Sequence, residues 1–268
     1  LGFAFRKTEQ GLIDFIDAPG HADFVRTMIS GATGIDAALI VVAANEGIMP
    51  QTSEHVRIVS LLGMERTVVA LTKSDLVSAD ELLTAEAEIR AYLSDMGFSE
   101  GAVVPVCAPT GEGMDELLTA LGDLFQNRIR PTDRGRFYLP IDRVFSMHGH
   151  GTVVTGTLRG GALTLGDEGE IAGTGIIARL RRLEVHGHEV CRANPGQRVA
   201  ANLRIAGGIK PLRGQALASP GWLTPSEWWS ASLRMADDGA TNLRNGKPVR
   251  LLFGTKEVIA TLRLLDRN

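Results

Sequence analysis

Two four-residue motifs in this chain carry side chains suited to nucleotide chemistry. Asp17-Ala-Pro-Gly20 follows the apolar run of residues 12–16, and Thr72-Lys-Ser-Asp75 follows the apolar run of residues 67–71. An Asp-x-x-Gly loop can hold a metal-bound water through its carboxylate, while the glycine amide meets a γ-phosphate. In the second motif, Lys73 can lie along a purine ring and Asp75 can accept two N–H bonds from guanine. Together the motifs predict the magnesium side and the guanine side of a GTP site.

The residues of the first motif have distinct expected roles. Asp17 is expected to bind Mg²⁺ through a water and Gly20 to turn when it meets the γ-phosphate, against the alternative of a plain strand-to-helix turn. His21 follows directly and is predicted to be catalytic, orienting the water that attacks the γ-phosphate. The alternative for His21 is an ordinary residue at the N-terminus of a helix.

The guanine side is predicted from two segments. Thr72, Lys73 and Asp75 form the expected guanine loop, although Thr72 stands where Asn is usual and replaces only part of its bonding. Cys107 and Ala108 follow the apolar run of residues 103–106 and are expected to complete the guanine pocket through a backbone N–H. The alternative for the first segment is a strand followed by a polar turn, and the alternative for the second is a plain turn at residues 109–113.

One component of a GTP site is missing from the sequence. No Gly-x-x-x-x-Gly-Lys-Ser/Thr loop, the usual cradle of the β- and γ-phosphates, occurs among the 268 residues. We therefore expect these residues alone to bind nucleotide poorly. We interpret the chain as a fragment whose phosphate loop lies upstream, and the alternative is a noncatalytic remnant that lacks the loop.

The elements that must position these motifs alternate between strands and helices. Apolar runs predict strands at residues 13–17, 37–43, 67–72 and 103–106, and helical periodicity predicts helices at residues 23–32, 52–62, 79–96 and 113–125. Such alternation indicates a parallel sheet covered on both faces, with ligands at the carboxyl ends of its strands. Residues 1–130 are thus predicted to be a partial α/β GTP-binding domain of the P-loop type, with its N-terminal part missing.

The pattern of apolar residues changes after a polar linker at residues 127–136. Residues 137–220 hold short β-branched runs separated by glycines, which are typical of a small antiparallel β-barrel domain. Residues 221–268 again resemble strands, notably at 249–253 and 257–265, and are predicted to be the start of a second, incomplete β-barrel domain.

The composition of the chain excludes several classes of protein and of metal site. The sequence is 44% hydrophobic and 22% charged, and its longest apolar run, residues 37–44, is far too short to span a membrane. Cys107 and Cys191 lack Cys-x-x-Cys spacing, so neither a disulfide framework nor a zinc site is indicated and a cytoplasmic location fits. His148/His150 and His186/His188 lack further ligands nearby and are interpreted as surface loop pairs.

The charge is unevenly divided along the chain. Residues 1–130 contain 9 basic and 19 acidic residues, a net charge of −10, whereas residues 131–268 contain 19 basic and 12 acidic residues, a net charge of +7. A basic second part suggests contact with a polyanion such as RNA. The alternative is a solvated surface with uneven charge.

Several longer segments resemble the elongation factor Tu group of translational GTPases. They are Asp17-Ala-Pro-Gly-His21, Asp36-Ala-Ala-Leu-Ile-Val-Val-Ala43, Gly47-Ile-Met-Pro-Gln-Thr-Ser-Glu-His55, Gly149-His-Gly-Thr-Val-Val-Thr-Gly156 and Pro195-Gly-Gln-Arg198. The resemblance covers nearly the whole chain. It implies a GTPase that uses GTP and Mg²⁺, binds tRNA and hydrolyses GTP slowly until the ribosome stimulates it.

Within this group, three features resemble the selenocysteine-specific factors. They are Leu1-Gly-Phe-Ala4, the Thr72-Lys-Ser-Asp75 form of the guanine loop and Ile141-Asp-Arg-Val-Phe145. The resemblance implies delivery of selenocysteinyl-tRNA to a ribosome at a recoded stop codon, with an mRNA hairpin bound by a further C-terminal domain outside these residues.

The resemblance also places the amino acid of the tRNA against the second domain, at Asp142, Arg143, Phe145 and Arg198. General carriers have an acidic residue in place of Arg143 and an amide in place of Arg198. A selenol ionises near neutral pH and a serine hydroxyl does not, so two guanidinium groups favour a selenolate. We therefore expect Arg143 and Arg198, with Asp142 orienting one of them, to select selenocysteine.

Three alternatives stay open at this point. Both arginines can be ordinary residues of a barrel surface. The chain can be another carrier, or a sulfate-activation GTPase of similar architecture. It can also be a tRNA-binding remnant without catalysis.

Overall fold

The computed structural model describes residues 2–8, 11–18, 35–64, 66–98, 101–125, 132–147, 151–205, 207, 209–233, 235 and 243–265. The chain divides into two units, which are Leu1–Arg128 with Arg234–Gly239, and Ile129–Leu233 with Ala240–Asn268. Separate hydrophobic clusters form the cores of the two units.

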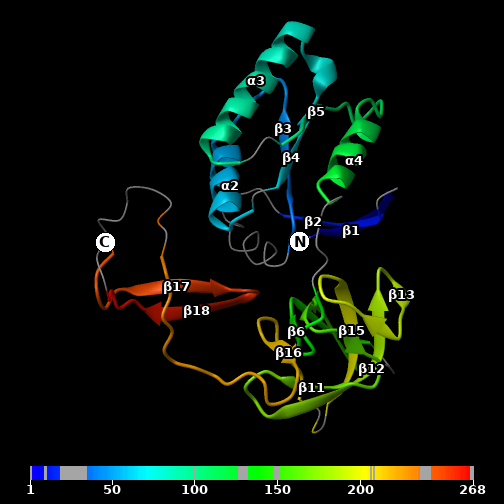
Figure 1. Cartoon of the computed structure of the whole chain (residues 1–268), viewed down its shortest axis with the longest axis vertical. Coiled ribbons are helices and arrows are strands. Elements are labelled where there is room, and N and C mark those ends of the chain that lie inside the picture. The colour runs from blue at the N-terminus through cyan, green and yellow to red at the C-terminus, as the bar shows by residue number, and fades with distance from the viewer. Residues whose placement is uncertain are drawn as a thin grey trace. The chain divides into compact units, whose positions relative to one another are not determined.

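The first unit is built on a parallel sheet. Its strands are β3 (Ala38–Ala43), β4 (Thr67–Thr72) and β5 (Val103–Pro105), in that order, with Ala38 paired to Thr67 and Val69 paired to Val103. Helices α2 (Pro50–Leu61) and α3 (Ala79–Asp95) lie on one side of the sheet and α4 (Met114–Asp123) on the other (Figure 1). These elements confirm the predicted strands and helices to within two residues at each end, whereas the helix predicted at residues 23–32 lies outside the described residues.

The central strand β4 shows why this sequence forms a sheet covered on both faces. Its residues from Thr67 to Leu71 are all buried. Alternate side chains point to opposite faces, so Val69 and Leu71 join the cluster formed with α2 and α3, while Val68 and Ala70 join the cluster formed with α4. A strand buried on both faces reads as an unbroken apolar run, which is what residues 67–71 are.

A second, antiparallel pair in this unit corrects the sequence prediction. Residues 13–17 were expected in the parallel sheet, but among the described pairs β2 (Gly11–Asp17) pairs with β1 (Gly2–Thr8) in an antiparallel register from Gly2↔Asp17 to Thr8↔Gly11. Only two residues separate these strands in the sequence. A connection of that length permits an antiparallel hairpin and is far too short for a parallel crossover.

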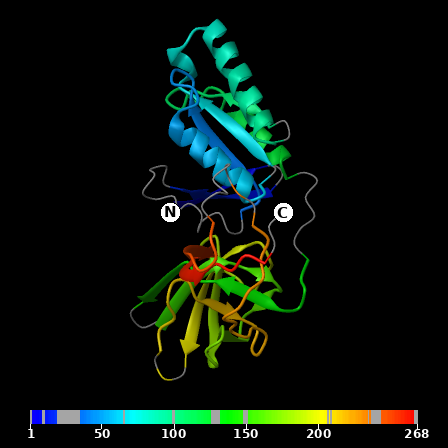
Figure 2. The ribbon, with the colours of Figure 1, turned by 90° about the vertical axis from the view of Figure 1, so that its left-hand side faces the viewer.

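The second unit contains a large antiparallel sheet (Figure 2). The hydrogen-bonded order is β7-β8-β15-β12-β11-β16-β6-β9, with β13 beside β12 and with β10 and β14 as a separate pair. The strands are β6 (Phe137–Pro140), β7 (Arg143–Met147), β8 (Gly151–Thr157), β9 (Arg159–Gly160), β10 (Leu163–Thr164), β11 (Glu168–Ile171), β12 (Ile176–Val185), β13 (His188–Glu189), β14 (Arg192–Ala193), β15 (Arg198–Ile205) and β16 (Ala216–Ala218). The predicted antiparallel sheet is confirmed, but the described pairs do not show a closed barrel.

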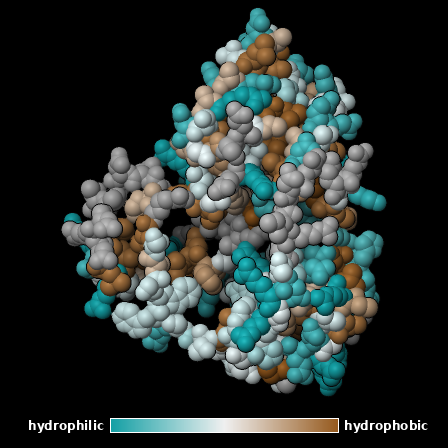
Figure 3. Space-filling view, in the orientation of Figure 1, coloured by the Kyte–Doolittle hydropathy of each residue, from teal (hydrophilic) through white to brown (hydrophobic). Residues whose placement is uncertain are grey.

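The last described strands form a two-stranded hairpin in the same unit. β17 (Pro248–Phe253) pairs with β18 (Lys256–Thr261), which confirms two predicted strands, although β18 ends four residues before the predicted end. Hydrophobic side chains gather over this hairpin (Figure 3), and Phe253 and Ile259 are 51% and 67% exposed. The domain boundaries at residues 137–220 and 221–268 stay a prediction.

Among the described residues, no helix combines the length and the apolar character that a membrane-spanning helix needs.

Candidate functional site

The predicted guanine loop begins where the buried strand β4 ends. The hydroxyl of Thr72 donates to the carbonyl oxygen of Val42 on β3 at 3.2 Å. Lys73 then takes a left-handed backbone conformation with φ of 57°, and the short 3₁₀ helix Ser74–Leu76 follows. This reversal carries Asp75 to an exposed position at the carboxyl end of the sheet. Thr72 therefore ties the loop to β3, which supplies part of the bonding expected of the usual Asn.

An acidic partner holds the lysine of this loop. Lys73 Nζ lies 2.7 Å from Glu46 Oε1, and both side chains are about half exposed. Glu46 follows the end of β3, so the ion pair joins the loops after two neighbouring strands. Glu46 was missed in the sequence, because its role depends on the parallel pairing of β3 with β4.

The predicted second segment of the guanine pocket lies beside the first. The backbone N–H of Ser74 donates to Val106 O at 3.4 Å, and the N–H of Val106 donates to Leu71 O at 2.9 Å. Cys107 is fully buried and its N–H is bonded to Glu112 O at 2.9 Å, whereas Ala108 is exposed. The structure thus brings the two predicted segments together, with Ala108 as the one of this pair that faces solvent.

On the predicted magnesium side, Asp17 is the one predicted site residue that the structure describes. Asp17 ends β2 and its side chain is exposed. A single carboxylate suits Mg²⁺, because this ion keeps several waters and is commonly bound by one or two carboxylates with phosphate oxygens. Gly20 and His21 lie outside the described residues.

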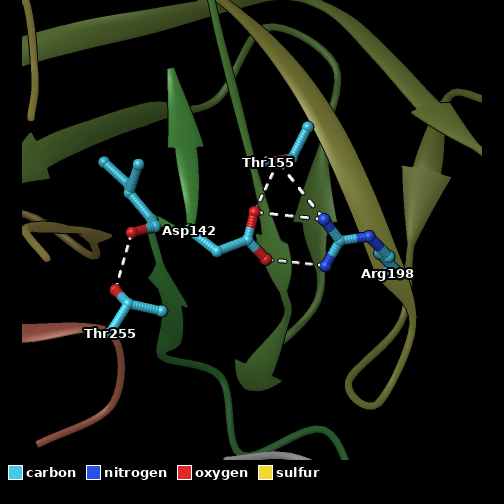
Figure 4. Close-up of polar contacts among 5 residues, drawn as sticks. Asp142, Thr155, Arg198 and Thr255 are labelled. Atoms are coloured by element: carbon cyan, nitrogen blue, oxygen red, sulfur yellow. Dashed lines mark hydrogen bonds and ion pairs between the residues drawn. The ribbon is translucent and has the colours of Figure 1, made fainter. Parts of the chain in front are cut away.

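In the second unit, Asp142, Thr155 and Arg198 form a compact polar group that we name the Asp142 cluster (Figure 4). Arg198 forms a two-point ion pair with Asp142, with Nη1–Oδ2 at 2.6 Å and Nη2–Oδ1 at 3.1 Å. The hydroxyl of Thr155 donates to Asp142 Oδ1 at 2.6 Å, and Arg198 Nη2 lies 3.4 Å from the same hydroxyl. The side chains of Arg198 and Asp142 are only 19% and 13% exposed. Planar two-point pairs of this kind are both strong and directional.

The backbone around Asp142 is held by several neighbours. Ile141 N donates to Gln215 O at 2.8 Å, and Ile141 O accepts from Gly214 N at 3.0 Å and from the hydroxyl of Thr255 at 2.7 Å. Asp142 N in turn donates to Thr155 O at 2.9 Å. Thr255 lies in the turn between β17 and β18 (Figure 4), so the hairpin supports the connection between β6 and β7 that carries Asp142.

The other two predicted aminoacyl residues lie on β7 beside this cluster. Arg143 is exposed and stands directly opposite Thr155 on β8, while Phe145 is 42% exposed and stands opposite Val153. Residues directly opposite each other in an antiparallel pair project from the same face. Arg143 and Thr155 therefore project from the same face of the sheet.

Thr155 is the residue of this cluster that the sequence prediction missed. Its only signal was a hydroxyl within the apolar strand of residues 151–157. The register that sets Thr155 opposite Arg143 on one side and Ala200 on the other is a property of the folded sheet.

Comparison with known proteins gives a consistent set of matches. Residues 3–127 match the family model described as the elongation factor Tu GTP binding domain. Over its whole length, the chain is 44% identical to the selenocysteine-specific elongation factor of Desulfomicrobium baculatum. The chain spans 42% of the length of that relative.

Solved structures show the same likeness. The apo form of translation elongation factor SelB from Methanococcus maripaludis superposes with a TM-score of 0.81 at 31% identity, over 97% of this chain and 57% of that one. The same factor, solved in complex with the GTP analogue GppNHp, also gives a TM-score of 0.81. A bacterial selenocysteine-specific elongation factor gives a TM-score of 0.85 at 29% identity, over 99% of this chain and 45% of that one.

Proposed function

We propose that this chain is an elongation factor Tu-like GTPase that serves in GTP-dependent delivery of selenocysteinyl-tRNA, because residues 3–127 match the elongation factor Tu GTP binding domain and the chain is similar to selenocysteine-specific elongation factors. The destination is a ribosome at a recoded stop codon, in the cytoplasm. The relatives' names and the match to a GTP-binding domain support this proposal. The Asp142 cluster is the observation that carries it.

The first unit supplies the nucleotide side of the proposal. Thr72, Lys73 and Asp75, with Ala108 beside them, bind the guanine base at the carboxyl ends of β4 and β5. Asp17 holds Mg²⁺ through a water. When bound, this ion neutralises charge on the phosphates of GTP. His21 orients the attacking water, and its placement by the ribosome sets the rate of hydrolysis.

The second unit supplies the aminoacyl side. Asp142, Arg143 and Arg198 together carry a net charge of +1 where β7 and β15 begin, with Asp142 directly before β7. A selenolate brings the charge of this group to zero, whereas a serine hydroxyl leaves it positive. Phe145 contributes an exposed aromatic surface on the same strand as Arg143. This charge balance favours selenocysteine over serine on the same tRNA.

One experiment tests this assignment directly. Dissociation of selenocysteinyl-tRNA and seryl-tRNA is measured from the natural protein loaded with GTP, before and after Arg198→Ala. We expect the substitution to speed release of selenocysteinyl-tRNA and to change release of seryl-tRNA little. The matched control is Arg192→Ala, which removes an exposed Arg–Asp pair of 2.7 Å with Asp133 elsewhere in the same unit.

The outcomes separate the proposal from its alternatives. An unchanged ratio of the two release rates after Arg198→Ala would show that the arginine is an ordinary surface residue. Equal retention of both tRNAs by the unmodified protein would favour another carrier of this architecture. Retention of tRNA that does not depend on GTP would favour a noncatalytic tRNA-binding remnant.

A further inference from the structure

In the Asp142 cluster, the guanidinium of Arg198 is already paired with a carboxylate, and this pairing affects how the proposed aminoacyl site selects its substrate. Both Nη atoms of Arg198 face the carboxylate of Asp142, and the pair is largely removed from solvent. The guanidinium that is proposed to meet a selenolate therefore already has a counter-ion. An entering side chain has to compete with Asp142 for Arg198.

We propose that the Asp142–Arg198 ion pair is a gate that excludes uncharged side chains, and that Thr155 holds the carboxylate of Asp142 while the gate is open. This inference rests on the proposed function, because it concerns the same aminoacyl site. In this proposal Asp142 also helps to exclude the serine side chain of seryl-tRNA, in addition to orienting Arg198.

The cost of opening the pair is the basis of the selection. Separating two charges that are mostly buried leaves each of them without its partner in a poorly solvated place. A selenolate compensates for this cost, since it replaces the carboxylate as the counter-ion of Arg198. A serine hydroxyl offers Arg198 only a neutral acceptor, so the closed pair stays the more stable arrangement.

The contacts of the cluster indicate which partner moves. Asp142 is held by its own N–H and by the hydroxyl of Thr155. The backbone N–H and C=O of the preceding residue, Ile141, are both hydrogen-bonded as well. Arg198 begins β15 and has a long, flexible side chain. The guanidinium therefore turns toward the selenolate, while Asp142 stays in place.

Thr155 and Arg143 stabilise the carboxylate that is left behind. The bond from the hydroxyl of Thr155 to Asp142 Oδ1 does not involve Arg198, so it persists when the pair opens. Arg143 lies opposite Thr155 and provides a second positive charge close by. Thr155 is thus a positioning residue, acting on the substrate only through Asp142.

The decisive test is Asp142→Asn in the natural protein loaded with GTP, with affinities measured for selenocysteinyl-tRNA and seryl-tRNA. Without the carboxylate, Arg198 has only a neutral acceptor at this position, so donation to a serine hydroxyl no longer requires an ion pair to be broken. We expect seryl-tRNA to bind roughly tenfold more tightly, the factor that corresponds to one hydrogen bond to a charged group. The control is Asp133→Asn, which disrupts the Asp133–Arg192 pair outside the cluster. Unchanged or weaker binding of seryl-tRNA to Asp142→Asn would overturn the gate.

A second pair of variants tests the role of Thr155. Thr155→Val keeps the shape of the side chain and removes the hydroxyl, so opening the pair becomes more costly. We expect selenocysteinyl-tRNA to bind about tenfold more weakly and seryl-tRNA to bind as before, with recovery in Thr155→Ser. Equal weakening of both tRNAs, or no recovery with serine, would show a merely structural role.

These outcomes are distinct from failure of the proposed function. If the unmodified protein does not prefer selenocysteinyl-tRNA, the proposed function falls and the gate falls with it. If the unmodified protein prefers selenocysteinyl-tRNA and Asp142→Asn does not tighten the binding of seryl-tRNA, the gate alone is wrong.

Discussion

At the scale of single residues, two cations that are candidates for ligand contact each have an acidic partner. Lys73 pairs with Glu46 and Arg198 pairs with Asp142, at 2.7 Å and 2.6 Å. The first pair is about half exposed, so solvent screens it and its contribution to stability is small. The second pair is mostly buried, where removal of one partner leaves a costly unpaired charge. Lys73 can therefore exchange its partner for a nucleotide at little cost, whereas Arg198 can leave Asp142 only for a ligand whose charge replaces that of the carboxylate.

The backbone of Lys73 separates its role in binding from its role in folding. A non-glycine residue at φ of 57° is strained, and glycine relieves that strain while adding entropy to the unfolded chain. We expect Lys73→Gly to change the free energy of unfolding by less than about 1 kcal/mol, since these effects oppose each other. Affinity for guanine nucleotide is expected to fall, because the side chain that covers the purine is gone.

The matched control for this prediction is His186→Gly. His186 is the other described non-glycine residue with a positive φ, at 53°, and lies in the turn between β12 and β13. It should leave nucleotide affinity unchanged. Denaturant unfolding and titration with a fluorescent GDP measure both quantities, and equal nucleotide affinity of Lys73→Gly and the unmodified protein would contradict the guanine assignment.

Single residues also show where sequence reasoning reached its limit. Asp142 and Arg198 were predicted as parts of one site, and the structure places them in direct contact, although their roles stay proposals. Glu46 and Thr155 were missed, because each acts through a neighbour that only the pairing of strands defines. Such partners are far apart in the sequence and carry no local pattern of their own.

At the scale of elements, local sequence signals placed the three described helices α2, α3 and α4 and the three strands of the parallel sheet correctly. Helix α3 begins after Ser78, whose hydroxyl accepts from the N–H of Glu81 while the carboxylate of Glu81 accepts from the N–H of Ser78. This reciprocal cap is a local signal, because the spacing Ser-x-x-Glu can be recognised directly in a sequence. The pairing of β1 with β2 was not foreseen, because an apolar run does not reveal the direction of its partner strand.

The cap of α3 predicts a pH-dependent effect of Ser78→Ala. Hydrogen bonds from the backbone and hydroxyl of Ser78 hold the pKa of Glu81 below its usual value of 4.5. A carboxylate with a lowered pKa stabilises the fold above its unfolded pKa, and this contribution is lost as pH falls through the folded pKa. We expect Ser78→Ala to cost about 1 kcal/mol near neutral pH, as for other serine caps, and less below pH 4.5.

Urea unfolding at several pH values measures this difference. Ser78→Thr is the control, since threonine keeps a hydroxyl at the cap and should retain most of the stability. A cost of Ser78→Ala that is the same at all pH values would show that Glu81 takes no part in it.

The β17–β18 hairpin is expected to be less protected from exchange than the large sheet of the second unit. Two-stranded hairpins are marginally stable alone, and among the described pairs neither strand has a second neighbour. Its backbone amides should therefore exchange with deuterium at least about tenfold faster than those of β12 and β15, which lie inside the large sheet. Mass spectrometry of exchanged peptides provides the measurement. Equal protection would mean that contacts such as Thr255 to Ile141 stabilise the hairpin more than its own ladder does.

At the scale of the whole molecule, the two units differ in kind as well as in sequence. Every described helix longer than one turn belongs to the first unit, and its core forms around a parallel sheet. The second unit has an antiparallel sheet around a single large cluster. The change from helical periodicity to short β-branched runs predicted this division, because helices and antiparallel strands bury their apolar side chains in different sequence patterns. Closure of a barrel was not predictable in the same way, since it depends on strand tilt and register.

Separate cores predict separate responses to mutation. Leu71 and Leu183 are each fully buried, one in the cluster around α2 and α3 and the other in the cluster of the antiparallel sheet. Replacement of either by alanine should cost about 2–5 kcal/mol in the unit that contains it, through lost burial and the cavity left behind. All three tryptophans lie in the second unit, so fluorescence follows that unit while far-ultraviolet circular dichroism follows the helices of the first. We expect Leu183→Ala to lower the midpoint of the fluorescence transition and Leu71→Ala to lower that of the dichroism transition. If each substitution shifted both transitions equally, the units would unfold as one cooperative body, and their separate cores would not correspond to separate stabilities.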